Sequence, residues 1–154
     1  MEMTGEQLIA LPQQATWDAL NDTAVLMDCI PGCDSIDKQS DTEYLLTMTA
    51  KVGPVSAKFK GKMTLSAVTA PDAYTLHFEG QGGVAGFAKG EASVKLTPEG
   101  EATRLSYSVK ASIGGKLAQV GSRLIDGVAK KTAEQFFSAF NRRMSATPGT
   151  GAPA

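Results

Sequence analysis

The sequence predicts an α+β fold in which a curved antiparallel sheet of about seven strands wraps around a long C-terminal helix, with two short helices after the first strand. Three observations lead to this fold class. The chain has 154 residues, of which 42% are hydrophobic, so it can form one domain with a real core. Residues 44–113 alternate between apolar and polar side chains, as strands with one buried face do. Residues 117–144 then repeat apolar side chains at helical spacing.

The N-terminal part predicts a strand followed by a pair of helices. Residues 2–11 mix polar and apolar positions as a strand does, and Pro12 then marks a helix start. A second short helix can begin at Thr23 and must stop at Pro31. In the stretch DCIPGC, residues 28–33, the proline ends this helix and the glycine permits the positive φ that turns the chain into a strand. We therefore interpret the stretch as a bend.

Two cysteines, Cys29 and Cys33, flank that bend and are the only ones in the chain. A zinc site needs about four Cys or His ligands, and the chain offers these two cysteines and one histidine. Their spacing also differs from the Cys-x2-Cys of thioredoxin-like redox centres. We expect no metal site here, whereas a conditional disulfide between the two thiols stays open.

The alternating region predicts five consecutive strands joined by short turns, which favours an antiparallel meander over a parallel sheet. The predicted strands span 44–52, 55–67, 74–80, 86–96 and 103–113. The turns between them contain Gly53-Pro54, Pro71-Asp72, Gly82-Gly83 and Pro98-Glu99-Gly100. Within 55–67, for example, the odd-numbered positions from Val55 to Ala67 face inward.

The period changes to that of a helix after Gly114-Gly115. The apolar stripe runs from Leu117 to Met144, and a helix of about 28 residues would be roughly 42 Å long. A long amphipathic helix must bury its stripe, and the apolar face of the sheet is the available partner. We expect residues 1–145 to form the domain and residues 146–154, which end in TPGTGAPA, to be a flexible tail.

Charge is distributed unevenly along the chain. Residues 1–43 hold nine acids against Lys38 alone, a net of −8, whereas residues 44–154 hold fourteen Lys or Arg against seven acids, a net of +7. The lysines that fall largely on the outward parity of the strands are Lys51, Lys58, Lys60, Lys62, Lys89, Lys95 and Lys110. They form either a basic face suited to an anionic membrane or acidic partner, or an ordinary solvated sheet face. In the second case the lysines keep the edge strands from pairing with other chains. Nucleic acid is not an expected partner, because these lysines are not interleaved with exposed aromatics.

The sequence also bears on location. No apolar run approaches the roughly 20 residues that span a bilayer, and the N-terminus lacks the order of a signal peptide. We therefore expect a cytoplasmic protein.

Small residues occupy many inward positions of the predicted sheet, where a solid core would have larger ones. These are Ala50, Ala57, Gly61, Gly80, Ala88, Gly90, Ala92 and Ala111. They indicate either sharp bending of the strands or a cavity, and the sequence leaves both open. A cavity would be lined by apolar and aromatic groups and would take a lipophilic ligand. The candidate lining residues are Met27, Met48, Phe59, Met63, Tyr74, Phe78, Tyr107, Val120, Leu124 and Val128.

Several segments together resemble a known family. In order, they are ATWDALND, CIPGCDSI, KVGPVSAKFKGKMTL, GQGGVAGFAKGEASVKL, LSYSVKASIGGKLAQVGSRLI and FFSAF. They are similar to the CoxG family of carbon monoxide dehydrogenase subunits, part of the START-like (SRPBCC) superfamily, over about residues 1–145. The resemblance implies the helix-grip fold, with the long helix across the concave face of the sheet, which agrees with the layout predicted from the residues.

The resemblance further implies an accessory protein rather than an enzyme. Family members help to associate carbon monoxide dehydrogenases and similar molybdenum hydroxylases with the inner face of the cytoplasmic membrane, and a lipid or quinone in the cavity is a natural extension. No metal or covalent cofactor is implied. The chain ends at Ala154, so membrane contact is expected to be peripheral or through a partner. The expected gate to the cavity consists of Ile30, Pro31, Gly83 and Phe87, with Phe87 pointing outward toward lipid or partner.

Two other functions remain open: a protein adaptor with a solid core, and a small cyclase-like enzyme acting on a lipophilic substrate. The enzyme finds little support among the residues. The sole histidine, His77, has outward parity, and Tyr44, Tyr74 and Tyr107 are the only inward candidates for proton transfer. The residues favour core tyrosines with satisfied hydroxyls as the explanation of these positions.

Overall fold

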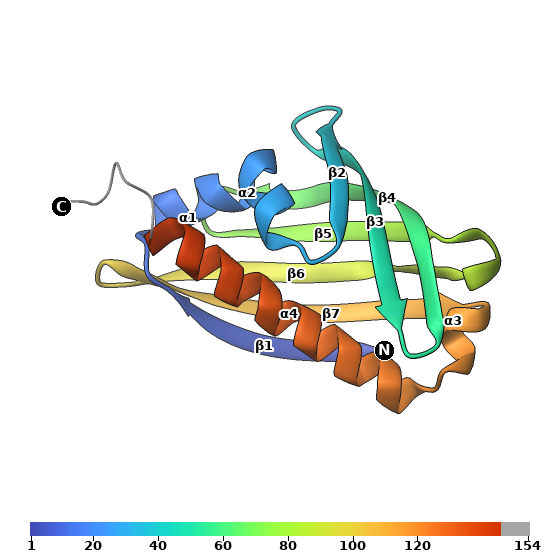
Figure 1. The fold of residues 1–154 in the computed structure, drawn as a ribbon. Coiled ribbons are helices and arrows are strands. Elements are labelled where there is room, and N and C mark those ends of the chain that lie inside the picture. The colour runs from blue at the N-terminus through green and yellow to red at the C-terminus, as the bar shows by residue number, and fades with distance from the viewer. Residues whose placement is uncertain (146–154) are drawn as a thin grey trace.

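A computed structural model describes residues 1–145, and the expected tail at 146–154 lies outside the described residues. Seven strands form one antiparallel sheet in the order β1-β7-β6-β5-β4-β3-β2 (Figure 1). Their bounds are β1 (Glu2–Ile9), β2 (Cys33–Lys38), β3 (Glu43–Val52), β4 (Val55–Thr69), β5 (Ala73–Gln81), β6 (Phe87–Glu99) and β7 (Ala102–Gly114). The predicted meander is confirmed, because each strand from β2 to β7 lies beside its neighbour in sequence.

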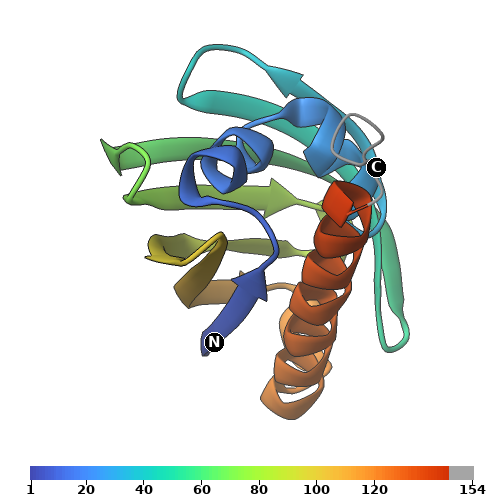
Figure 2. The ribbon, with the colours of Figure 1, turned by 90° about the vertical axis from the view of Figure 1, so that its left-hand side faces the viewer.

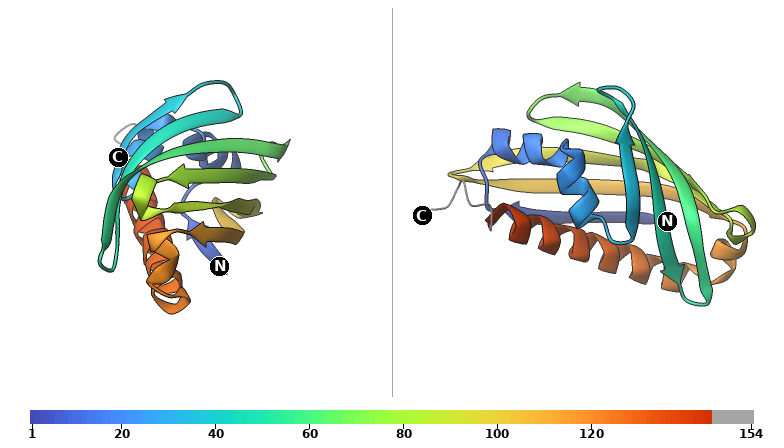
Figure 3. Two further views of the ribbon diagram at one scale, coloured as in Figure 1. Left: turned by 90° about the vertical axis from the view of Figure 1, so that its right-hand side faces the viewer. Right: turned by 45° about the horizontal axis from the view of Figure 1, so that its top comes forward.

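Helices cover the concave side of this sheet. They are α1 (Gln13–Leu20), α2 (Thr23–Cys29) and α4 (Ser122–Ser145), whereas the 3-10 turn η1 (Gly83–Ala85) and the single turn α3 (Lys116–Gln119) lie at one end of the sheet. The long helix α4 runs across the inside of the curved sheet, with α1 and α2 beside its C-terminal half (Figure 2). Two further views show the strands curving around α4 (Figure 3). The predicted α+β fold class is therefore confirmed, including the two short helices after the first strand.

The C-terminal helix does not begin where the apolar stripe begins. The sequence predicts one helix over 117–144, whereas the structure has the single turn α3, a break, and then α4. Gly121 causes the break, because its φ of +98° lies outside the helical region. The apolar spacing continues through the break, so periodicity alone could not reveal it.

The DCIPGC stretch is a bend, as predicted. Helix α2 ends at Cys29, and Gly32 has a φ of +76°. The Thr49 backbone N–H donates to the Gly32 carbonyl oxygen at 2.9 Å, and a Cβ on Gly32 would collide with the Thr49 carbonyl. Both cysteines are free thiols, and burial raises the pKa of each above its ordinary value. Raised thiol pKa values make these cysteines poor nucleophiles.

One predicted orientation on β4 is wrong. The alternation places Ala67 inward, but Ala67 is exposed with a φ of +49°, where the register shifts between Ser66 and Thr69. A β-bulge adds a residue to one strand and reverses the parity beyond it. The inward pattern of β4 therefore ends at Leu65.

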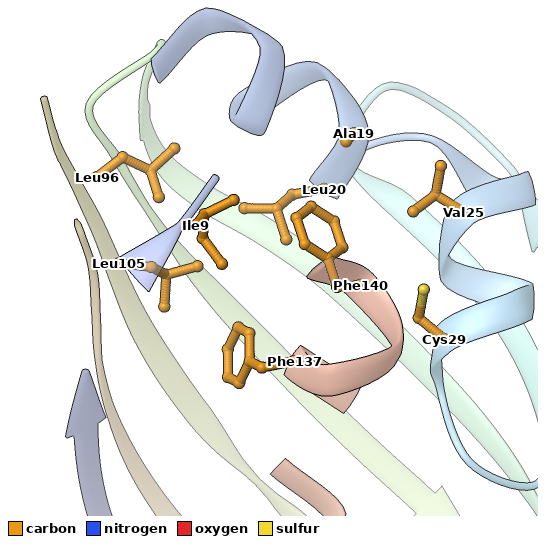
Figure 4. Packing of buried hydrophobic residues seen from close by; sticks show 9 residues of the cluster. All are labelled: Ile9, Ala19, Leu20, Val25, Cys29, Leu96, Leu105, Phe137 and Phe140. Carbon is orange, nitrogen blue, oxygen red and sulfur yellow. The ribbon is translucent and has the colours of Figure 1, made fainter. Parts of the chain in front are cut away.

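The solid core lies at one end of the molecule, where the C-terminal half of α4 meets α1, α2 and the adjoining strands. It consists of Ile9, Ala19, Leu20, Val25, Cys29, Leu96, Leu105, Phe137 and Phe140 (Figure 4). Two buried threonines tie the chain together there: the Thr103 hydroxyl donates to the Leu11 carbonyl at 2.7 Å, and the Thr16 hydroxyl donates to the Pro12 carbonyl at 2.9 Å. Toward the other end, the inner face of the sheet is only half-buried.

Candidate ligand-binding site

Two adjoining hollows lie between the sheet and the helices. The first chamber has a volume of about 450 Å³ and the second chamber about 320 Å³. Ile30, Met63 and Leu76 border both, so the two chambers meet at a shared wall. These volumes lie in the range of small-molecule sites, about 300–1,000 Å³. A cavity, one of the two alternatives that the small inward residues left open, is thus present in the structure.

The first chamber is built by the middle strands, the helical pair and α4. Its walls are Met3, Leu20, Asn21, Leu26, Ile30, Pro31, Tyr44, Met63, Leu65, Tyr74, Leu76, Ala92, Val94, Leu105, Tyr107, Val109, Ala129, Thr132, Ala133, Phe136 and Phe137. No charged side chain occurs among these described residues. Tyr74 is held by an edge contact with Trp17, at 5.4 Å between ring centroids, and Tyr107 stacks on Phe137 at 5.6 Å.

The second chamber is almost wholly apolar. It is bordered by Ile30, Leu46, Met48, Ala50, Val52, Phe59, Gly61, Lys62, Met63, Leu76, Phe78, Glu79, Gly80, Ala88 and Leu117. The two charged residues of this set, Lys62 and Glu79, have the outward parity and are exposed, and Lys62 pairs with Glu43 at 4.0 Å. Neither charge faces the interior.

Small residues turn out to serve both purposes that the sequence left open. Gly61 and Gly80 line the second chamber, and a Cβ on Gly80 would have no neighbour closer than 4.0 Å. Gly90 is different, because a Cβ there would collide with the carbonyl oxygen of Lys110 on the next strand. Gly61 and Gly80 therefore create volume, whereas Gly90 permits close approach of the backbones.

Three tyrosines, Tyr44, Tyr74 and Tyr107, place phenol hydroxyls in the wall of the first chamber. Burial raises the pKa of Tyr74 to about 12, and the nearby Tyr44 phenol acts in the same direction. Burial also raises the pKa values of Tyr44 and Tyr107 above the ordinary 10.0. All three phenols are therefore neutral at physiological pH, and they can donate hydrogen bonds but cannot act as bases.

Six of the ten predicted lining residues reach the chambers. Met48, Phe59, Met63 and Phe78 border the second chamber, and Met63, Tyr74 and Tyr107 border the first. These side chains lie on strands, where the inward parity is set by the two-residue repeat.

The other four predicted lining residues lie outside both chambers. Met27 is on the exposed side of α2, with its sulfur 3.8 Å from Cys33 Sγ. Val120 is in the break before α4, and Leu124 is 39% exposed above Gly53. Val128 is half-buried, but α4 contacts the first chamber one residue later, at Ala129. The apolar stripe runs through the break before Ser122 as if the helix were continuous. It therefore could not show which side of α4 faces the hollow.

The predicted gate divides in the same way. Ile30 and Pro31 border the first chamber, whereas Gly83 and Phe87 border neither. The Phe87 ring is half-buried on the outer face, where it covers Gly114 and has the Lys89 ammonium 5.9 Å from its centroid. The exposed apolar group of that hairpin is instead Val84, at 84%.

Sequence reasoning missed the walls contributed by the helical pair. Leu20 of α1 and Leu26 of α2 border the first chamber, as does Thr132 of α4. The apolar spacing of Trp17 and Leu20 marked an inward side of α1, but nothing local shows which part of the sheet that side covers.

His77 faces outward, as predicted, with its Nε2 2.9 Å from the Ser66 hydroxyl and its Nδ1 3.7 Å from Glu91. Within residues 1–145, no three His, Cys, Asp or Glu side chains gather as metal ligands would. In the same range, no helix is long and apolar enough to cross a bilayer.

A sequence model of the CoxG family of carbon monoxide dehydrogenase subunits matches residues 5–145. The chain belongs to the CoxG family. The resemblance of the sequence segments is thereby confirmed. No curated protein matches the chain.

Solved structures place this CoxG family member in the START-like fold. A conserved protein from Geobacillus kaustophilus is 29% identical, with a TM-score of 0.88 over 94% of this chain and 95% of that one. A START superfamily protein from Mycobacterium smegmatis is 13% identical, with a TM-score of 0.70 over 92% and 95%. The Zhui aromatase/cyclase from Streptomyces is 9% identical, with a TM-score of 0.73 over 99% of both chains. The last two likenesses show the fold alone.

Proposed function

We propose that this CoxG family protein is a non-catalytic carrier that holds a lipophilic molecule, a lipid or a quinone, and helps to associate a carbon monoxide dehydrogenase or related molybdenum hydroxylase with the cytoplasmic membrane. Membership of the CoxG family supports the accessory role toward the dehydrogenase. The carrier role rests on the cavity. Location at the inner face of the membrane, by peripheral contact, is part of the same proposal.

The observation that carries the proposal is the pair of connected apolar chambers. A solid core would bring α4 against the whole sheet, but among the described side chains of α4 only Phe137 and Phe140 are buried. Beyond that cluster, Met48, Phe59 and Phe78 are half-buried around open volume. Apolar surface stabilises a protein only where it is removed from water, by about 25 cal/mol for each Å² that is covered. A lipophilic ligand would cover it.

The membrane part of the proposal is supported by charge at one end of the molecule. The β3–β4 hairpin, the β5–β6 connection with η1, and the start of α4 with α3 gather there (Figure 1, right). We call this the basic end: segments 50–61, 80–90 and 111–125 contain no Asp or Glu. They carry the exposed cations Lys51, Lys58, Lys60, Lys116 and Arg123. Each basic residue near an anionic bilayer contributes about 1 kcal/mol.

The rest of the outer sheet face does not share this character. In the ladder, Glu79 stands opposite both Lys62 and Lys89, and Lys110 stands opposite Glu91 and Glu2. Opposite charges on neighbouring strands compensate one another. The basic end, rather than the whole basic face considered from the sequence, is therefore the proposed membrane contact.

The test of the carrier role is extraction of the freshly purified protein with organic solvent, followed by mass spectrometry against a matched blank. A stoichiometric lipid or quinone is the expected result. The control is Gly80→Leu, which places a side chain in the second chamber and should lower the yield. A folded wild type that contains no lipophile and takes up no added quinone would overturn the carrier role and favour a protein adaptor.

A second candidate is a small enzyme acting on a lipophilic substrate, and one observation favours it: Tyr44 and Tyr74 place two phenols in a largely apolar chamber. Neutral phenols could act as general acids. This function requires that Tyr74→Phe abolish turnover of a supplied substrate while the protein stays folded. A ligand recovered chemically unchanged after prolonged incubation would count against it.

A further inference from the structure

The buried hydroxyl of Tyr44 differs from those of Thr16 and Thr103, because it lacks a hydrogen-bond partner within residues 1–145. The Tyr44 side chain lies at the start of β3 and is only 2% exposed. Its hydroxyl is buried, and no group in residues 1–145 forms a hydrogen bond with it. Buried polar groups in folded proteins nearly always have a partner, because leaving one unpaired costs free energy. The buried hydroxyls of Thr16 and Thr103 do have partners.

The orphaned phenol belongs to the wall of the first chamber. Tyr44 pairs with Met63 across the β3–β4 ladder, and Met63 borders both chambers. Of the other polar side chains in this wall, Asn21 donates its amide to the Trp17 carbonyl at 2.9 Å. Within residues 1–145, the hydroxyls of Tyr74, Tyr107 and Thr132 are not among the fully buried atoms that lack a partner. Tyr44 is thus the wall residue with an unused, fully buried hydrogen-bonding capacity.

The walls also limit what the hydroxyl can meet. The first chamber has no charged residue among its described lining, and the charges that border the second chamber point outward. An ionised carboxylate or phosphate inside would remain unpaired in apolar surroundings, which is strongly unfavourable. A neutral carbonyl oxygen accepts a hydrogen bond from a phenol without that cost.

We propose that Tyr44 is the polar anchor of the cavity and donates its hydroxyl hydrogen to the oxygen of a neutral carbonyl-bearing lipophile, whose apolar part extends past Ile30 into the second chamber. This inference rests on the proposed carrier function and adds the class and the orientation of the ligand. The carbonyl end occupies the first chamber, near the solid core. The apolar end lies toward Phe59 and the basic end. Fatty-acid anions and phospholipid head groups are excluded from the interior.

The experiment measures the affinity of purified protein for two probes of equal chain length, 2-decyl-1,4-benzoquinone and decylbenzene, by displacement of N-phenyl-1-naphthylamine. We expect wild type to prefer the quinone. Tyr44→Phe should weaken quinone binding by about three- to tenfold and leave decylbenzene binding unchanged. Tyr107→Phe is the matched control, since it removes a phenol from the same chamber, and it should affect quinone binding less than Tyr44→Phe does.

Folding of the variant is checked by its thermal midpoint, which should not fall, because Phe retains the ring and removes only an unpaired hydroxyl. A second pair of probes, 2-dodecanone and dodecanoate at pH 8, tests the requirement for neutrality, and the ketone should bind at least about tenfold more tightly.

The possible failures are distinguishable. If wild type binds neither decyl probe, the carrier function fails and the anchor fails with it. If wild type binds both decyl probes and Tyr44→Phe leaves the quinone affinity unchanged, or weakens both probes alike, the carrier function stands and the anchor is overturned. Equal affinity for the ketone and dodecanoate would overturn the proposed ligand class.

Discussion

Gly61 and Gly80 stand opposite each other across the β4–β5 ladder, and both border the second chamber. This pair leaves the inner face of two adjacent strands without side chains. The two glycines differ in their room for a substituent: a Cβ on Gly61 would lie 3.3 Å from Leu46 Cγ, whereas a Cβ on Gly80 meets nothing closer than 4.0 Å. The second chamber is therefore open mainly on the β5 side.

Gly80→Leu should fill the second chamber without disturbing the fold. We expect ligand affinity to fall by at least about tenfold and the free energy of unfolding to change by no more than about 1 kcal/mol. Gly61→Leu should also reduce binding, but at a greater loss of stability because Leu46 must move. Displacement of a bound fluorophore and urea unfolding measure the two effects. Full affinity in a folded Gly80→Leu protein would show that the second chamber holds no ligand.

Gly90→Ala should destabilise the protein for a different reason. The added methyl group would collide with the Lys110 carbonyl, so β6 and β7 would have to separate. Forced overpacking of this kind costs about 1–3 kcal/mol. Urea unfolding measures this loss, and Ala88→Gly on the same strand is a control that adds no atom. A Gly90→Ala protein as stable as wild type would contradict the close approach of these strands.

The two ends of the molecule should respond differently to loss of a phenylalanine. Phe140 is fully buried, so Phe140→Ala should cost about 3–5 kcal/mol. Phe78 borders the hollow and is half-buried, so Phe78→Ala in the ligand-free protein should cost less than about 2 kcal/mol. Unfolding of ligand-free protein in urea compares the two. Equal losses would mean that the second chamber is packed in solution.

Alkaline pH should weaken the fold through Tyr74. Its folded pKa of about 12 lies above the ordinary 10.0, so the neutral phenol stabilises the native state fully below pH 10. That contribution is lost as pH rises from 10 to 12. Between pH 9 and pH 11, wild type should lose about 1 kcal/mol more stability than Tyr74→Phe. Parallel losses in the two proteins, measured by urea unfolding at each pH, would contradict the raised pKa.

The basic end should bind anionic vesicles. Replacing Lys58 and Lys60 with alanine should weaken binding to phosphatidylglycerol vesicles by roughly 30-fold, at about 1 kcal/mol for each charge. Val84→Asp should weaken it further, because Val84, which is 84% exposed, is the most exposed large apolar side chain at that end. The control is Val68→Asp, near the β4–β5 turn at the other end of the strands, which is 46% exposed and should bind as wild type does. Cosedimentation measures all four proteins, and equal binding would reject the basic end as a membrane contact.

The strands were predictable because each one carries its own signal. In β4, the alternation of Phe59 and Met63 with lysines fixes the inward parity wherever one face is buried. The bend at Gly32 was predictable for the same reason, since proline and glycine act on the neighbouring backbone. Within β4, the predicted inward orientation is wrong at Ala67. The register shift there, next to the β4–β5 turn, leaves no trace in the hydrophobic pattern.

The sequence by itself thus determined which strand residues face inward and that the helix must cross them, because side-chain direction follows from local backbone geometry. Only the tertiary structure decided where the helix begins, which of its side chains reach the hollow, and where that hollow lies. Val128 and Ala129 are adjacent in the stripe, yet only Ala129 borders the first chamber. A cavity is the space that remains between packed elements, and contacts between residues far apart in the sequence bring those elements together. Its walls, and the unpaired hydroxyl of Tyr44 within them, exist only once sheet and helices have packed.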